Sequence, residues 1–279
     1  MTQVTTTLRL MTYNMLHAPG DRLGPLVDVV RAEDPDIVAC QEINTFEGGL
    51  DLARELGMVP VWGRANSAED FRDGEPVFEH LLVLAKVWPE LVRVHRGDRR
   101  AMFRPVLETL FRFPGLPAVR LFVVHLRALV DAELRFLKFR ELGALLGVLA
   151  EAEGEVVVMG DFNAREPGAR VFGPAREVPE DHRAAVNGEV VGAITATGLV
   201  DSLRLLHPER KEGESTLIKV EGSRVDYIFV NDLLVPHVSK SYIVDNDAVL
   251  VASDHRPVVT ELSWGHGSAD SGERQLLPR

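Results

Sequence analysis

The sequence predicts an α/β layered domain, and two observations lead to this prediction. Short apolar runs with the Val, Ile and Leu content of β-strands alternate along the chain with segments of helical periodicity. The pattern is continuous, because no stretch of Ser, Pro or Gly is long enough to act as a linker. We therefore expect a single domain over residues 7–263. Residues 264–279 mix Gly, Ser, charge and proline without apolar periodicity, so we expect a flexible tail there.

The strand candidates are short apolar runs, most of them bounded by Gly, Pro, Asp or Asn. They lie near Leu8–Thr12, Ile37–Cys40, Leu81–Ala85, Val119–Val124, Val156–Met159, Val225–Val230 and Pro257–Leu262. Two polar stretches between candidate elements, Gly63–Glu79 and Arg165–Val190, are expected to be surface loops. Such loops frame a binding site in some folds and are plain insertions in others, and both readings stay open here.

Three segments favour helices. The clearest runs from Asp131 to Glu153, where leucines recur at three- and four-residue spacing and Asp131 can cap the first turn. Shorter helices fit Leu23–Ala32 and Gly48–Leu56, and Gly57 is expected to end the second of them. Helices of this length between strands are what a layered α/β domain needs to cover its sheets.

Charge and composition narrow the classes of function. The chain has 31 Lys+Arg against 42 Asp+Glu, and a formal net charge of −11 at pH 7 argues against broad, sequence-blind binding to nucleic acid. A basic cluster is formed by Arg93, Arg96, Arg99, Arg100 and Arg104. It is read equally well as a local phosphate contact and as the charged edge of a sheet. The lone Cys40 excludes a disulfide framework and reads as a buried small hydrophobe.

The chain carries no membrane-length segment and no sign of a secretory leader. No stretch approaches the roughly 18 unbroken apolar residues of a membrane helix, and no positive charge precedes Arg9. We therefore expect a soluble, cytoplasmic protein, with a monomer favoured.

Polar side chains stand where apolar strands stop. Asn14 follows the first strand candidate, Glu42 follows the second, and Asp161 and Asn163 follow the run that ends near Met159. Strand ends are where open α/β sheets place ligands. Each of these residues alone is also well explained as a turn former or as a solvated strand end. Their repetition at successive strand ends indicates a site.

Further polar residues lie inside or after apolar runs. Asp226 is set inside a strand candidate, where a charge is costly unless it is paired, and a nearby imidazolium would supply a partner. His125 follows a strand candidate and alone is more typical of a core histidine than of a catalytic one. Asp254 alone would cap a turn before Pro257. Gathered carboxylates repel each other, and a hard cation such as Mg²⁺ removes that repulsion.

Six short motifs follow one another between Leu8 and Leu262. They are Met11–Asn14, Asp34–Glu42, Val123–Leu126, Gly160–Asn163, Arg224–Phe229 and Ser253–Val258. In this order the set resembles the endonuclease/exonuclease/phosphatase superfamily, which has the DNase I-like fold. The resemblance implies an α+β four-layer sandwich, in which two packed mixed β-sheets are flanked by helices and the active site lies at one edge of the sandwich.

The resemblance also implies roles for the motif residues. In the implied metal site, for Mg²⁺ with Mn²⁺ as an alternative, Glu42 is a principal ligand, Asn14 orients metal-bound groups, and Asp254 contributes directly or through water. Asp161 would orient or deprotonate the attacking water. Asn163 would hold the phosphate, and His125 would contact or protonate a phosphoryl or leaving-group oxygen. His255, paired with Asp226, would contact the phosphate and stabilise the pentacovalent state.

Some positions depart from the family pattern. Val123–Val124 are apolar where family members commonly have Asn-Thr ahead of the central histidine. Glu79 or His80 could support His125, but exposure at the start of a strand is the favoured reading of both. Asp201 matches a recurrent family segment in which the acid more often caps a helix than performs chemistry.

The sequence thus predicts a divalent-metal-dependent phosphoesterase that hydrolyses a phosphodiester or phosphomonoester by in-line attack of an activated water. Its expected partner is a phosphorylated substrate, either a small molecule or a nucleic-acid end. The alternatives are a DNA endonuclease or exonuclease of the same family and a non-catalytic binding module. A binding module would be expected to lack at least one of Glu42, Asp161, Asp226, Asp254 and His255, and all five are present.

Overall fold

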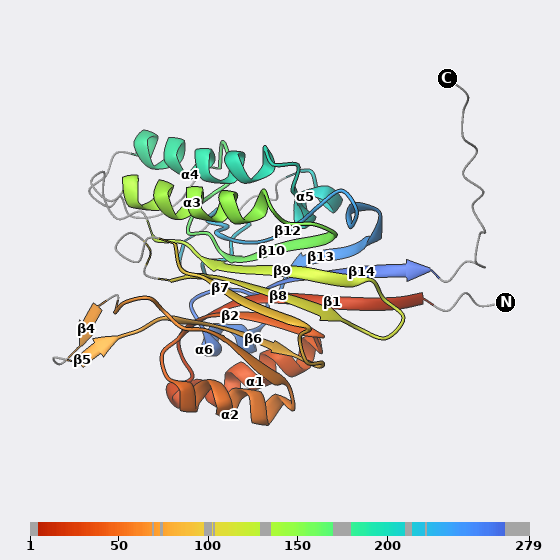
Figure 1. Cartoon of the computed structure of the whole chain (residues 1–279). Helices are drawn as coiled ribbons and strands as arrows, with labels where there is room; N and C mark the ends of the chain where they lie inside the picture. The colour runs from red at the N-terminus through yellow and green to blue at the C-terminus, as the bar shows by residue number, and fades with distance from the viewer. Residues whose placement is uncertain are drawn as a thin grey trace, which may run out of the picture.

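Two six-stranded β-sheets pack face to face in the computed structural model, and helices cover both outer faces (Figure 1). The structure describes residues 5–68, 70–72, 75–97, 102, 104–128, 135–169, 180–209, 214–220 and 222–265, without the side chains of 70–72, 135 and 180–187. The four layers confirm the predicted α+β sandwich of two mixed sheets. Among the described residues, no helix has both the length and the apolar character needed to cross a membrane.

The first sheet has the strand order β13-β14-β1-β2-β6-β3. Its strands are β1 (Thr5–Ala18), β2 (Ile37–Ile43), β3 (Val59–Gly63), β6 (His80–Ala85), β13 (Val238–Ile243) and β14 (Val258–Gly265). Only β1 and β2 pair in parallel, with Asn14 opposite Gln41. Because parallel strands end at the same edge of a sheet, Asn14 and Glu42 lie close together.

The second sheet has the strand order β11-β12-β10-β9-β8-β7. Its strands are β7 (Leu91–His95), β8 (Val106–Arg112), β9 (Ala118–His125), β10 (Glu155–Asp161), β11 (Val200–Asp201) and β12 (Asp226–Val230). The central strand β10 pairs in parallel with β9 and antiparallel with β12. In this register Asp161 lies opposite His125 on one side and opposite Asp226 on the other.

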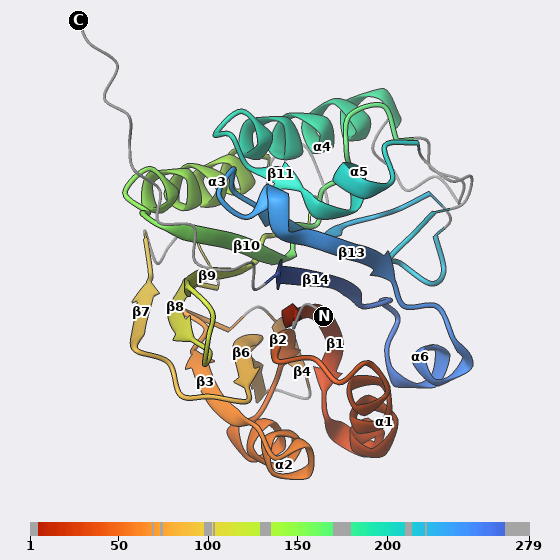
Figure 2. The ribbon, with the colours of Figure 1, turned by 90° about the vertical axis from the view of Figure 1, so that its right-hand side faces the viewer.

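Most helices form the two outer layers, as the view turned by 90° also shows (Figure 2), whereas the short α5 contacts strands of both sheets. They are α1 (Leu23–Glu33), α2 (Phe46–Leu56), α3 (Arg135–Leu149), α4 (Glu180–Thr195), α5 (Ser202–Leu206) and α6 (Asp247–Ala252). Helices α1, α2 and α6 pack on the first sheet, and α3 and α4 pack on the second. Helix α2 begins at the cap Thr45, whose hydroxyl accepts from the Gly48 N–H, and it ends at Gly57 as predicted.

Three apolar clusters fill the spaces between the layers. One lies between the two sheets, and the others lie between each sheet and its helices. Strand β1 shows how one strand serves two clusters, because Leu10 faces the other sheet while Met11 and Tyr13 face the helices. Strands buried on both faces read as near-continuous apolar runs, which is why the sequence revealed them.

The sequence did not predict the strands β3, β7, β8, β11 and β13. Four of them, β3, β7, β11 and β13, lie at sheet edges. Charged or polar residues weaken the apolar signal of β7 and β13, Pro60 and Gly63 interrupt that of β3, and β11 has only two residues. A small hairpin of β4 (Asp70–Arg72) and β5 (Glu75–Val77) also lies within a stretch predicted to be a loop.

The prediction of a surface loop over Arg165–Val190 is wrong from Glu180 onward, because helix α4 begins there. Four of its first five residues are not apolar, and among its described side chains Val190, Val191 and Ile194 pack in the core. The proposed cap Asp131 lies outside the described residues, as do residues 266–279 of the predicted tail. Strand β14 extends to Gly265, two residues beyond the predicted domain end.

Candidate active site

The polar residues of the motifs meet at one edge of the sandwich, where the ends of β1, β2, β9 and β10 come together. The amide of Asn14 joins the two sheets: its Nδ2 donates to Glu42 Oε1 at 2.9 Å and to Asp161 Oδ2 at 3.0 Å. Its Oδ1 accepts from the Leu16 N–H at 3.1 Å. The amide therefore orients the two carboxylates and is itself held by the backbone.

Glu42 is directed into the site by an irregularity of β2. Regular alternation would send its side chain toward the helices, as it does Cys40. The pairing of β2 with β6 shifts register between Cys40 and Ile43, and Glu42 has a φ of 60°. A bulge of this kind re-aims one side chain. Burial, together with the nearby Glu79 carboxylate, raises the pKa of Glu42 to about 7.

Asp161 is the centre of the hydrogen-bond network. Its Oδ1 accepts from the Asn163 N–H at 2.7 Å, and its Oδ2 accepts from the Asn163 Nδ2 at 3.2 Å. The Nε2 of His125 lies 3.4 Å from the same Oδ2. Burial, followed by the charge of Asp226, raises the pKa of Asp161 to about 6. The carboxylate is thus poised to change protonation near neutral pH, as a general base must.

Asp226 and His255 form a buried ion pair, with 2.9 Å between His255 Nδ1 and Asp226 Oδ2. Burial alone would lower the pKa of His255, but the charge and hydrogen bond of Asp226 raise it to about 10. The imidazole is therefore cationic at neutral pH. Asp161, Asp226 and His255 each offer an atom within 4.8 Å of the other two, so the cation lies beside the central carboxylate.

The expectation that Glu79 and His80 are exposed at the start of a strand is wrong. Both are buried. The Oε2 of Glu79 pairs with Arg104 and lies 3.8 Å from His125 Nδ1, so this carboxylate supports the site. His80 stacks on Phe46 instead, with ring centroids 4.9 Å apart. Burial, followed by the charge of Arg104, lowers the pKa of His125, and its imidazole is neutral.

Helix α3 contributes two residues that sequence reasoning missed. Lys138 is fully buried, and its Nζ donates to the Asn163 carbonyl. One turn along the helix, Glu141 accepts the N–H of Arg127 at 2.7 Å. The pair therefore holds the turns after β10 and β9. Burial lowers the pKa of Lys138 to about 7. The only sequence signal was a charged pair at i, i+3 spacing beside the leucine stripe.

The oxygen donors fit a divalent cation. Glu42 is partly exposed toward the site, and the Oδ1 of Asp254 is buried without a hydrogen-bond partner, as an unused metal donor would be. Among the described residues, however, Asp254 belongs to no group of carboxylate and imidazole atoms within 4.8 Å of one another. Its assignment as a direct ligand stays a prediction, as does that of Asn14. Asp201 caps α5 and pairs with Arg224, away from the chemistry.

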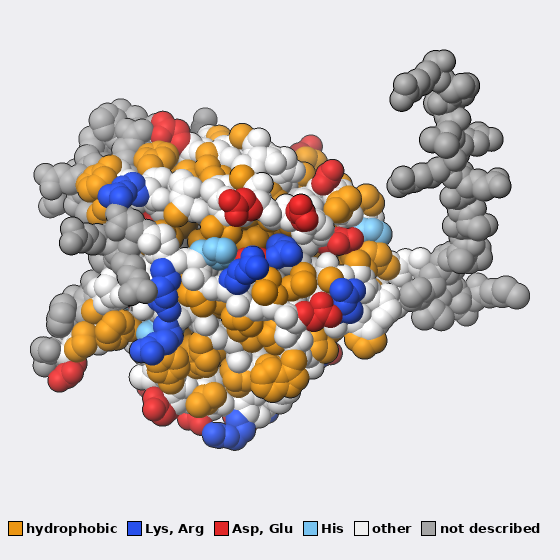
Figure 3. All heavy atoms as spheres, in the orientation of Figure 1, with side chains coloured by type: hydrophobic (Ala, Val, Ile, Leu, Met, Phe, Trp, Pro, Cys, Tyr) orange, Lys and Arg blue, Asp and Glu red, His pale blue; other side chains and the backbone are white. Residues whose placement is uncertain are grey.

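Not all of the five arginines that form the basic cluster in the sequence lie on the surface. Arg104 is buried and paired with Glu79, so it is not part of a basic surface. Arg99 and Arg100 lie outside the described residues. On the face shown in Figure 3, Lys and Arg side chains are dispersed among hydrophobic and uncharged groups and form no continuous basic surface. Arg93 is exposed on β7, and Arg96 bonds to Asn66 at 2.8 Å.

Comparison with known proteins gives one family and a shared fold. The model of the endonuclease/exonuclease/phosphatase family matches residues 11–255. An endonuclease/exonuclease/phosphatase from Beutenbergia cavernae has a TM-score of 0.71 and 22% identity, over 93% of this chain and 72% of that one. An AP endonuclease from Archaeoglobus fulgidus has a TM-score of 0.68 and 18% identity, over 91% and 98% of the two chains.

A 3' phosphatase from Neisseria, bound to product DNA hairpin, has a TM-score of 0.68 and 21% identity, over 92% of this chain and all of that one (100%). Likeness at this level of identity shows a common fold. None of the curated proteins matches the sequence.

Proposed function

This chain belongs to the endonuclease/exonuclease/phosphatase family, and from that premise we propose that it is a divalent-metal-dependent phosphoesterase that uses an activated water. The observation that carries the proposal is the convergence of both sheets on Asp161. Amides from Asn14 and Asn163 hold this carboxylate, and His125 and the His255 cation lie beside it. Hydrolysis of a phosphoester needs a base for water and positive groups for the developing charge, and the set supplies both.

Each residue has a task that its environment supports. Asp161 orients the attacking water and accepts its proton. His255, kept cationic by Asp226, stabilises the charge of the pentacovalent state, while neutral His125 and the Asn163 amide contact phosphoryl or leaving-group oxygens. A divalent cation at Glu42, with Asn14 and Asp254 contributing, would supply charge neutralisation on the substrate oxygens. Mg²⁺ suits these oxygen donors, and Mn²⁺ is the alternative.

A DNA end is the second candidate substrate. It is favoured by the similar fold of a 3' phosphatase bound to product DNA and of an AP endonuclease. The net charge of −11 and the inward position of Arg104 oppose contact with a long stretch of phosphates. The proposal therefore names a phosphoester as the substrate class, with a small phosphorylated molecule or a nucleic-acid end as the two forms.

A substrate panel tests the function. Wild type and Asp161→Asn would be assayed on a phosphodiester, a phosphomonoester, an abasic-site duplex and sphingomyelin, each with Mg²⁺ and with Mn²⁺. We expect metal-dependent turnover of at least one substrate, and its loss in the variant, which keeps the size of the side chain. Equal turnover by the two proteins would remove Asp161 from the reaction, and no turnover of any phosphoester would contradict the function.

A further inference from the structure

The turn after Asn14 presents a histidine to the site. Leu16 and His17 have φ values of 47° and 54°, a left-handed conformation that is costly for residues other than glycine. The guanidinium of Arg22 donates to the Met15 carbonyl at 3.1 Å and to that of Leu16, which holds the turn in place. The His17 imidazole is thereby folded back toward Glu42 rather than out into solvent.

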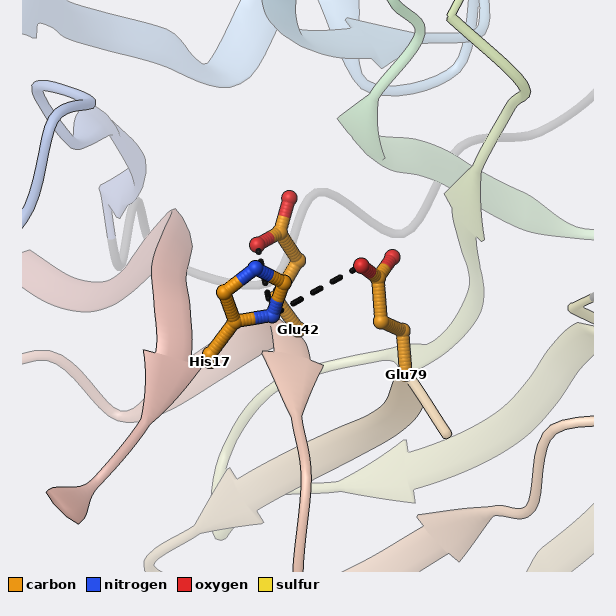
Figure 4. Close-up of side chains that lie close together, drawn as sticks. All are labelled: His17, Glu42 and Glu79. Carbon is orange, nitrogen blue, oxygen red and sulfur yellow. Dashed lines mark ion pairs between the residues drawn. The ribbon is translucent and has the colours of Figure 1, made fainter. Parts of the chain in front are cut away.

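The imidazole faces two carboxylates (Figure 4). His17 Nδ1 lies 3.5 Å from Glu42 Oε2 and 3.6 Å from Glu79 Oε1. Each of the three residues offers a ligand atom within 4.8 Å of those of the other two. Hydrogen bonds of this type are usually about 2.9 Å long. Ligand atoms that each lie about 2.1 Å from one shared ion are separated by roughly 3–4 Å, which matches the observed spacing.

Each of the two carboxylates pairs with another residue through one oxygen and faces His17 with the other. The Oε1 of Glu42 accepts from Asn14, and its Oε2 faces His17. The Oε2 of Glu79 pairs with Arg104, and its Oε1 faces His17. Arg104 balances one of the two negative charges, so the cluster with a neutral imidazole retains one negative charge. A cation bound among the three atoms would offset it.

A second, independent observation concerns His125. Its side chain is 2% exposed, and its Nδ1 has no hydrogen-bond partner although it points toward Glu79, 3.8 Å from Oε2. Buried polar atoms are almost always paired, so an unpaired one indicates a missing partner such as an ion or an ordered water. The vacant nitrogen borders the same carboxylate that faces His17.

We propose that His17, Glu42 and Glu79 form a second cation site, next to the site of the proposed function and sharing Glu42 with it. One imidazole nitrogen and two carboxylate oxygens suit Mn²⁺ or Zn²⁺ better than Mg²⁺, which prefers oxygen ligands alone. The inference rests on the proposed function only for the sharing of Glu42. The Glu42 carboxylate bridges the two positions, with Oε1 toward Asn14 and Oε2 toward His17.

Calorimetric titration of metal-free protein with Mn²⁺ tests the site. We expect two ions per chain in the wild type and one in His17→Ala and in Glu79→Gln. His237→Ala is the matched control, because it removes a histidine that stacks on Trp264 far along β14, and it should keep two ions. His17 lies near the end of β1, is 24% exposed and belongs to none of the apolar clusters, so its replacement should leave the core intact.

A spectroscopic readout reports the ligand itself. Electron spin-echo modulation of bound Mn²⁺ should show coupling to an imidazole nitrogen in the wild type, and this coupling should weaken in His17→Ala. An ion count that is the same in the wild type, His17→Ala and Glu79→Gln, whether one or two, would overturn the proposal and leave His17 as an ion-pair partner of the carboxylates. Neither result depends on turnover, so a protein that binds two ions without hydrolysing a phosphoester would contradict only the proposed function.

Discussion

The two sheets build their halves of the site by different means. The first sheet places Asn14, His17 and Glu42 through irregular backbone, with a register shift in β2 and positive φ angles at His17 and Glu42. The second sheet places His125 and Asp161 at the ends of two strands that pair without a register shift, although φ is positive here too, at Gly160 and Asn163. The side chains of the first half thus take their direction from irregular backbone, and those of the second half from the pairing of their strands.

Anchoring also differs between the halves. The turns of the second sheet are held by buried charged side chains of α3, Lys138 to the Asn163 carbonyl and Glu141 to the Arg127 N–H. The turn of the first sheet is held by Arg22 on two successive carbonyls. The comparison teaches that the half proposed to bind the metal depends on a register shift, and the half proposed to activate water depends on an unshifted ladder with a buried anchor.

We expect the largest effect from a substitution in the proposed metal site. Glu42→Gln removes the charged oxygens that a cation with few protein ligands requires, so affinity for Mg²⁺ should fall and turnover should drop by several orders of magnitude. Calorimetric titration with Mg²⁺ and a steady-state assay on the best substrate of the panel measure both effects. Unchanged Mg²⁺ affinity in the variant would remove Glu42 from the metal site.

We expect the next largest effect from a substitution of the residue proposed to activate the water. Asp161→Asn keeps the shape of the side chain, and we expect the variant to fold normally and to lose roughly 10²–10⁴-fold in kcat. Thermal unfolding compared with the wild type provides the control for folding. A variant with a rate near that of the wild type would assign proton transfer to another group.

A smaller effect tests the anchor on α3. Lys138→Met removes the donor to the Asn163 carbonyl and lets the phosphate-binding amide shift, for which we expect a loss of up to about 10²-fold in kcat. Metal affinity should be unchanged, because Lys138 contacts only the second half of the site. Lys240→Met, at an exposed lysine paired with Glu261, is the matched control. Loss of Mg²⁺ affinity in Lys138→Met would show that the halves are not separable.

The pH dependence of stability gives a second test of the buried position of Lys138. Burial lowers the pKa of Lys138 from 10.5 to about 7, although Asp161 and Glu141 oppose the shift. Between these values the unfolded chain binds a proton that the folded chain does not, so the contribution of Lys138 to the free energy of unfolding rises with pH. Below pH 7 Lys138 is protonated in both the folded and the unfolded chain, so the free energy of unfolding is reduced by the full cost of burying its charge.

Urea unfolding of wild type and Lys138→Met at pH 7, 8 and 9 measures this contribution. The free energy of unfolding of the wild type, relative to the variant, should increase by up to about 1.4 kcal/mol per pH unit. A difference that stays constant with pH would show that Lys138 keeps its ordinary pKa in the folded state.

The sequence predicted the regular half of the site better than the irregular half. Apolar runs placed Asp161 after one strand and Asp226 inside another, because strand pattern and burial are local signals, whereas the pairing of these two strands emerged only from the structure. The motif also located Glu42, but the bulge that aims it is set by pairing with β6, which lies about 40 residues away in the chain.

Other residues escaped prediction for a shared reason. Glu79, Arg104 and Lys138 are charged, and charged residues are mostly exposed, so sequence reasoning placed Glu79 and Arg104 on the surface and gave Lys138 no role. Their burial depends on partners distant in sequence: Glu79 with Arg104, and Lys138 with the Asn163 carbonyl. A pairing of this kind is visible only when the two sheets and α3 are assembled.

The most direct test of the central claim, that the two sheets build one metal-dependent phosphoesterase centre, is a reconstitution assay. Protein stripped of metal by a chelator would be assayed on the best substrate of the panel before and after addition of Mg²⁺ or Mn²⁺, with Glu42→Gln treated in parallel. We predict no turnover before addition, full recovery in the wild type and none in the variant. Turnover by stripped wild type equal to that of the reconstituted protein would contradict the account.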